Sequence, residues 1–120
     1  MQRLEQAVTG LEQSLKSSPG WPQSWRFSVR QRLLAVADAL YDEAASEGDS
    51  GLSAREDGAR RERQRLLGQL SVLLPEVAER RDLEVVRRKV LRFVGDVEHH
   101  NQRLHDLLYD AVGMEVGGSE

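Results

Sequence analysis

Few residues of this chain could carry chemistry, and its three histidines stand close together in the sequence. His99, His100 and His105 lie one, five and six positions apart. A pair of histidines spaced by four would aim two ligands at one metal ion from a single helix, and no pair here has that spacing. His100 differs from the other two because it interrupts an apolar series with helical steps of three and four residues. That series comprises Leu83, Val86, Val90, Phe93, Val97, His100, Leu104, Leu107, Ala111 and Met114.

Two further charged residues fall on predicted inner faces and could meet His100. Arg63 takes a place in the apolar series of one helix, and Glu43 stands near the end of the series of another. A buried arginine is tolerated when its charge is paired, and its fixed positive charge repels a metal ion. We therefore predict a buried polar layer of Glu43, Arg63 and His100. A metal or ligand role for His100 and partial exposure of its ring are the alternatives, whereas His99 and His105 are predicted to be solvated.

The composition excludes several other chemistries. The chain has no cysteine, which rules out disulfides, thiolate metal sites and a cysteine nucleophile. No serine stands near a histidine in the sequence, and the glycines at 48 and 51 lack the lysine and the spacing of a phosphate-binding loop. We therefore expect no catalytic residues, and we predict that the protein is not an enzyme.

The charge distribution argues against a nucleic-acid or membrane surface as the partner. The chain carries 17 basic and 20 acidic residues, for a net charge of −3, so any such contact would have to be local. Two basic clusters, at 60–65 and 87–92, have acidic residues within or beside them. Such clusters more often form ion pairs along an exposed helix. Charges also recur throughout the first 20 residues, which predicts neither a signal peptide nor a membrane span.

The elements that position these residues are predicted to be helices. The chain is 39% hydrophobic and only 5% aromatic, and its apolar residues recur at helical spacing. Turn-forming residues separate the periodic segments, most densely at 46–51, where we expect the most flexible loop. The predicted helices span about 2–18, 23–46, 53–74 and 80–112, followed by a flexible tail at 113–120.

Short connections between amphipathic helices favour one compact arrangement. A short loop forces the next helix to return beside the previous one, so we predict an all-α, up-down-up-down antiparallel four-helix bundle that forms a single domain over 1–120. A two-chain coiled coil is the competing packing, because regular apolar stripes also favour self-association.

Several short stretches of the chain resemble those of small bacterial, especially actinobacterial, hemerythrin-like domains. The resemblance rests on Trp25, Leu33, Tyr41-Asp42-Glu43, the stretch 47–52, Arg61-Glu62, the stretch 100–103, and the stretches 106–111 and 115–118. It implies a four-helix bundle whose inner histidines and carboxylates hold non-haem di-iron. Of the inner histidines of that family, only the one matching His100 is present, since Ala44 and Arg63 occupy two of the other places. The chain also lacks the Glu-x-x-His pattern of ferritin-like sites.

These observations predict a non-catalytic, cytoplasmic interaction or regulatory module, a hemerythrin-like domain that has lost its di-iron site. We expect a protein partner or self-association, and no cofactor. The alternative is a hemerythrin-like sensor or carrier for oxygen or redox state, with iron held in a reduced site by His100, Glu43 and Glu47.

Overall fold

The computed structural model describes residues 2–16, 22–46 and 53–118, and within them the side chains of 3–16, 22–44 and 57–107. These residues form four helices and contain no strand. The helices are α1 (Gln2–Lys16), α2 (Pro22–Ser46), α3 (Ser53–Glu79) and α4 (Leu83–Gly118). The predicted flexible loop at 46–51 lies outside the described residues apart from Ser46, as do residues 17–18 of the first predicted helix.

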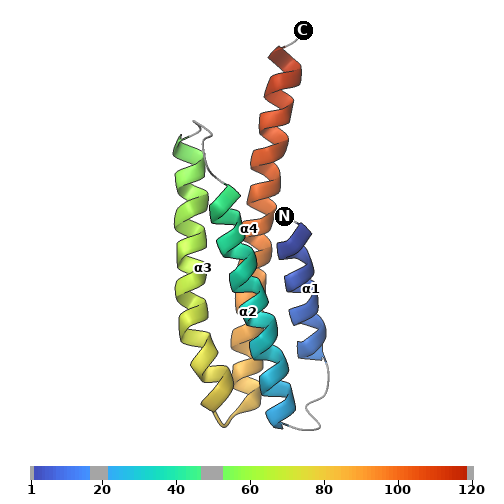
Figure 1. Ribbon diagram of the computed structural model, residues 1–120, viewed down its shortest axis with the longest axis vertical. Helices are drawn as coiled ribbons and strands as arrows, with labels where there is room; N and C mark the ends of the chain where they lie inside the picture. Colours follow the sequence, from blue (N-terminus) through green and yellow to red (C-terminus); the bar gives the residue numbers. More distant parts are fainter. Residues whose placement is uncertain (1, 17–21, 47–52, 119–120) are drawn as a thin grey trace.

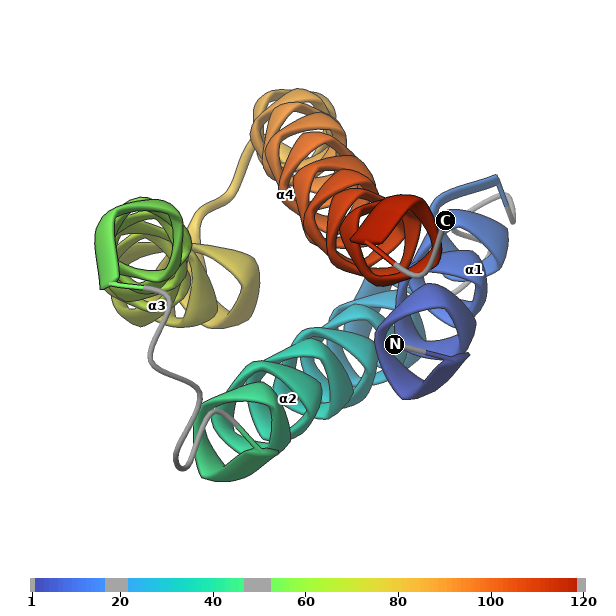
Figure 2. The same ribbon diagram turned by 90° about the horizontal axis from the view of Figure 1, so that it is seen from above.

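The four helices pack side by side with alternating directions (Figure 1), and each contacts the helices before and after it around a ring (Figure 2). Seen from above, α1 closes the ring by packing against α4. The molecule measures 59 × 22 × 19 Å along its principal axes. The predicted all-α four-helix bundle is therefore confirmed at the level of its architecture.

Each helix turns one apolar stripe toward the shared core, as the spacing of its apolar residues predicts. An apolar residue at every third or fourth position places all of them on one face, so a single face can be buried against the neighbouring helices. The stripes of the first two helices are fully inside the bundle. They comprise Leu4, Val8, Leu11 and Leu15 of α1 and Trp25, Val29, Leu33, Val36 and Leu40 of α2.

The third helix does not end at Pro75, so the predicted end at residue 74 is wrong. Proline within a helix removes one backbone hydrogen bond, yet α3 continues to Glu79. Two tertiary contacts explain the continuation. The side chain of Val77 is completely buried in the core, and Arg26 of α2 donates hydrogen bonds to the backbone carbonyls of Val77, at 2.8 Å, and Arg80. These donors satisfy carbonyl groups that the end of a helix leaves without a partner.

The fourth helix begins at Leu83, three residues later than the predicted residue 80. The side chain of Asp82 accepts hydrogen bonds from the backbone N–H groups of Glu84 and Val85, at 3.1 and 3.3 Å. These contacts make Asp82 the N-cap of α4. We expect Asp82→Ala to lower the free energy of unfolding by about 1 kcal/mol, measured by urea denaturation. Asp82→Asn keeps the accepting oxygen and should cost much less; equal losses in the two variants would contradict a capping role.

The same helix also continues past its predicted end at residue 112, through Gly118. The prediction of a loose tail over 113–120 is therefore wrong up to that residue. Glycine costs about 1 kcal/mol in a helix but does not forbid it, and no described glycine adopts the positive φ that ends many helices. As a result, α4 rises beyond the other three helices (Figure 1). Among the described residues, no helix has a stretch long and apolar enough to cross a membrane.

Candidate functional site

The candidate site lies inside the upper half of the bundle as drawn in Figure 1. Here the last turns of α2, the first half of α3 and the middle of α4 meet. Arg63 and His100 are the only polar or charged residues among the described ones that are buried, and the ring of His100 is completely inaccessible. A buried ionisable group must be paired and hydrogen-bonded, because burial removes the water that stabilises its charge. The partners of these two residues therefore define the site.

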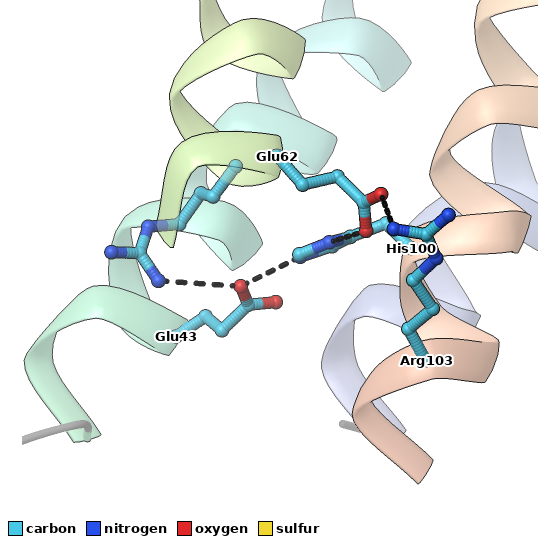
Figure 3. A network of polar contacts seen from close by, with 5 residues as sticks. Glu43, Glu62, His100 and Arg103 are labelled. Carbon is cyan, nitrogen blue, oxygen red and sulfur yellow. Dashed lines mark hydrogen bonds and ion pairs between the residues drawn. The ribbon is translucent and has the colours of Figure 1, made fainter. Parts of the chain in front are cut away.

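His100 lies between two carboxylates that approach it from different helices (Figure 3). Its Nε2 atom is 2.8 Å from Oε2 of Glu43, on α2, and its Nδ1 atom is 2.6 Å from Oε1 of Glu62, on α3. Both carboxylates are mostly buried, with 13% and 14% of their side chains exposed. The imidazole of α4 thus connects α2 and α3 across the interior.

An arginine stands beyond each carboxylate and completes a chain of alternating charge. Nη1 of Arg63 is 3.4 Å from the same Glu43 oxygen that His100 contacts, and Nη1 of Arg103 is 3.0 Å from Oε2 of Glu62. Arg63 is inside the bundle with 6% of its side chain exposed, whereas Arg103 is 61% exposed. We call this sequence of contacts the ion chain: Arg63, Glu43, His100, Glu62 and Arg103.

The geometry favours a proton on each ring nitrogen of His100, because both of its partners are carboxylates that also contact an arginine. A neutral imidazole has one N–H donor, and its other nitrogen carries a lone pair. Placed 2.6 or 2.8 Å from a carboxylate oxygen, that lone pair would be repelled. We therefore assign the charged imidazolium, in which Nε2 donates to Glu43 and Nδ1 donates to Glu62. Burial lowers the pKa of His100, but its hydrogen bonds and charge attraction to Glu43 and Glu62 outweigh burial, so the pKa lies above the ordinary value of 6.5.

The structure brings together the three residues of the predicted polar layer, Glu43, Arg63 and His100, and adds two that the sequence analysis did not place there. Glu62 directly precedes Arg63, one helical step of about 100° from the inner face, and it reads as part of a solvated basic cluster. Arg103 stands one turn after His100 and is exposed, as expected for its face of the helix. His100 and Arg103 stand three residues apart, so they lie on neighbouring positions of one helix face. This spacing is the signal that could have indicated a common acidic partner, which the structure shows to be Glu62.

The other two histidines lie outside this site. His99 is exposed, and 44% of the side chain of His105 is exposed, so the prediction that both are solvated is confirmed. Nε2 of His105 is 2.7 Å from Oε1 of Glu5 on α1. The same Glu5 oxygen accepts a hydrogen bond from Asn101 at 3.2 Å. The hydrogen bond from Asn101 has the larger effect and the contact with His105 the next largest. Together they hold the pKa of the Glu5 carboxyl below its ordinary value.

The arrangement of donors does not fit the di-iron centre that the resemblance implies. Glu43 and Glu62 lie on opposite edges of the His100 ring, so one ion cannot bind a ring nitrogen together with both carboxylates. A positively charged arginine also touches each carboxylate, Arg63 on one side and Arg103 on the other. Among the residues that the structure describes, no three histidine, aspartate or glutamate side chains form a group suited to a metal ion. Glu47, the third ligand of the alternative site, lies outside those residues.

The comparisons with known proteins give no match among family models, curated proteins or solved structures. The hemerythrin-like resemblance therefore stays a prediction that rests on the short stretches of sequence that carry it. The class defined by the fold and the site is an all-α four-helix bundle with an ion chain across its interior. Any function must accordingly be argued from the geometry of this chain alone.

Proposed function

We propose that this protein is a non-catalytic interaction or regulatory module that associates with a second copy of itself through the projecting end of α4. The observation that carries the proposal is the length of α4 relative to its neighbours. It has 36 residues, against 15, 25 and 27 in α1, α2 and α3. An isolated helical end is marginally stable in water. A helix that extends beyond the rest of its bundle therefore gains stability by packing against another surface.

The contacts of α4 show where its neighbours stop. Glu43 lies beside His100 only three residues before the end of α2, and Glu5, beside Asn101 and His105, is close to the start of α1. α3 begins nine residues before Glu62 and so extends about 14 Å past the level of His100, at 1.5 Å per residue. α4 continues for 18 residues past His100, about 27 Å by the same rise. About half of that length therefore lies beyond every other helix.

The apolar series of α4 continues into the projecting end. Leu104 and Leu107 are half-buried, where the series leaves the core, and the sequence carries it on through Ala111 and Met114. Such a stripe at steps of three and four is self-complementary, because two antiparallel copies related by a twofold axis present the same surface to each other. This continuity favours a second copy over an unrelated partner.

The ion chain supports a non-catalytic role. A catalytic acid, base or nucleophile must exchange its proton or its partner with a substrate. Both ring nitrogens of His100 are instead occupied by Glu43 and Glu62. A cytoplasmic location belongs to the same proposal, and it stays a prediction.

Sedimentation equilibrium of the intact protein tests the association. We expect a reversible dimer that Leu107→Glu weakens at least tenfold, because a charge would enter the apolar contact. Val72→Glu is the matched control, since Val72 is an exposed apolar residue of α3 with 63% of its surface accessible. It should leave the dimer unchanged, with helix content equal in all three proteins by circular dichroism. A monomer at every concentration, or equal weakening by both substitutions, would contradict the proposal.

The metal-binding sensor is the second candidate, and the proximity of Glu43 to His100 is the observation in its favour. Metal analysis and an absorption spectrum of protein purified without chelators test it. Stoichiometric iron that disappears in His100→Ala would support the sensor and overturn the ion chain. Iron at well below one equivalent, unaltered by that substitution, is the result that the ion chain predicts.

A further inference from the structure

We propose that the second proton on the His100 ring is a pH-responsive latch, which holds α3 against α4 in the upper half of the bundle and releases it as the pH rises. The latch consists of the contacts of His100 with Glu43 and Glu62, at 2.8 and 2.6 Å. With both carboxylates ionised, the two contacts are attractive together while each ring nitrogen carries a proton. Removing one proton changes one of the two attractions into a repulsion.

The two sides of the ring differ in what holds the carboxylate in place. Glu43 keeps a second cation, Arg63, which is itself buried at 6% exposure. The second cation of Glu62 is Arg103 of α4, which is 61% exposed, so water screens this pair and it holds α3 to α4 only weakly. When His100 becomes neutral, Nε2 keeps its proton toward Glu43, and the lone pair of Nδ1 faces Glu62. The contact between α3 and α4 at Glu62 is therefore the one that opens.

The two carboxylates that contact His100 lie mostly inside the bundle, so the expected pH response belongs to this buried histidine and not to the exposed ones. α2 supplies Glu43, and α3 supplies Glu62 with Arg63 behind Glu43. α4 itself supplies Arg103, and Glu5 of α1 contacts Asn101 and His105 and not His100. The exposed pair of His105 with Glu5 has similar contact chemistry but is screened by water. It provides a comparison within the same molecule.

The direction of the response follows from linkage. His100 has a raised pKa in the folded protein, so its contribution to stability is complete below about pH 6.5, the ordinary histidine value. That contribution falls as the pH rises from there through the folded pKa, and it is absent above it. Between these limits the opening equilibrium should shift toward the open form by up to about tenfold for each pH unit.

The consequence for association rests on the proposed function. Leu104 and Leu107 lie one and two helical turns beyond His100, at the root of the projecting end of α4. Release of α3 from α4 at Glu62 uncovers the apolar seam just below that end. A change in pH would then alter the surface offered to a second copy.

Hydrogen exchange of backbone amides tests the latch in the intact protein at a concentration where it is monomeric. Protection factors, which correct for the intrinsic effect of pH on exchange, are compared at about pH 6 and about pH 8.5. Protection over 57–66 and 97–103 should fall at the higher pH, by up to about tenfold for each pH unit between about 6.5 and the folded pKa. Protection over 29–36 and 86–93, deeper in the core, should change much less.

Glu62→Gln is the decisive variant, because the glutamine amide can donate to a neutral Nδ1 and removes the need for the second proton. Its protection over 57–66 should be nearly the same at both pH values. The matched control, Glu5→Gln, alters the exposed pair with His105 and should retain the response of the unmodified protein.

Three outcomes would overturn the latch: equal protection at both pH values in the unmodified protein, an unchanged pH response in Glu62→Gln, or loss of the response in Glu5→Gln. If Glu62→Gln does not fold, the comparison of His105→Asn with Arg103→Gln replaces it, and the latch predicts that neither abolishes the response. A response that is present in a protein that never dimerises would leave the latch intact and contradict only the proposed function.

Discussion

Glu43→Gln should lower the free energy of unfolding at neutral pH by about 3 kcal/mol. The carboxylate of Glu43 on α2 contacts both buried cations, Arg63 and His100, through the same oxygen. Glutamine has nearly the same shape but no charge, so the two cations would face each other without the anion between them. Urea denaturation of the variant and of the unmodified protein, with the same slope in both, measures the loss.

The neighbouring residue provides a matched control for Glu43. Asp42 forms an ion pair with Arg3 of α1, but 53% of its side chain is exposed, compared with 13% for Glu43. Exposed pairs contribute between zero and about 1 kcal/mol, so Asp42→Asn should cost less than about 1 kcal/mol. Losses of similar size in the two variants would mean that Glu43 is an ordinary surface acid.

His100→Leu should also be destabilising, by about 2 to 3 kcal/mol near pH 6. The sequence alone leaves room for a histidine that merely fills the core, for which leucine would be neutral or better. The two carboxylates that contact the ring exclude that case, because leucine would leave Glu43 and Glu62 facing an apolar side chain. The measurement is urea denaturation at several pH values.

The pH dependence of this loss identifies its cause. The raised pKa of His100 means that its contribution is complete below about pH 6.5 and disappears as the pH rises through the folded value. The difference in stability between the unmodified protein and His100→Leu should therefore shrink toward alkaline pH. A difference that stays constant or grows with pH would show that the histidine contributes through packing and not through its charge.

Replacing the whole buried part of the ion chain should reverse the effect of the single changes. A buried ionic cluster is often no more stable than apolar residues of similar volume, because burying charges removes their hydration. A variant that carries Glu43→Leu, Glu62→Leu, Arg63→Met and His100→Leu together should thus be at least as stable as the unmodified protein. Such a result would indicate that the ion chain determines the register between the helices or the pH response. It would also show that the ion chain adds no stability relative to apolar residues.

The apolar stripes were predictable from the sequence because helical burial is a local property. Trp25, Val29 and Leu33 recur at steps of four, and this spacing alone places them on one face. The inner positions of Arg63 and His100 followed from the same count. Their pairing with Glu43 followed from the antiparallel order of the helices together with the rule that a buried charge requires a partner.

The features that sequence reasoning missed depend on contacts between helices. α3 passes Pro75 because Arg26 reaches its final carbonyls from another helix, and no local rule contains that contact. Glu62 lies one step off the inner face, so its burial depends on how closely α3 approaches α4. The predicted end of α4 at residue 112 assumed that Gly113 stops the helix. A glycine lowers helix stability only modestly, and α4 continues through it.

The charge state of His100 is the point on which the ion chain, the latch and the poor fit of the ion-chain residues to a metal ion all depend. Nitrogen-15 NMR of the histidine rings, followed from pH 5 to pH 10, measures it directly. We predict that both ring nitrogens of His100 carry protons at neutral pH, each coupled to its hydrogen, and that the ring titrates above the ordinary midpoint of about 6.5. A neutral single tautomer at pH 6, or a midpoint below the ordinary value, would contradict the account.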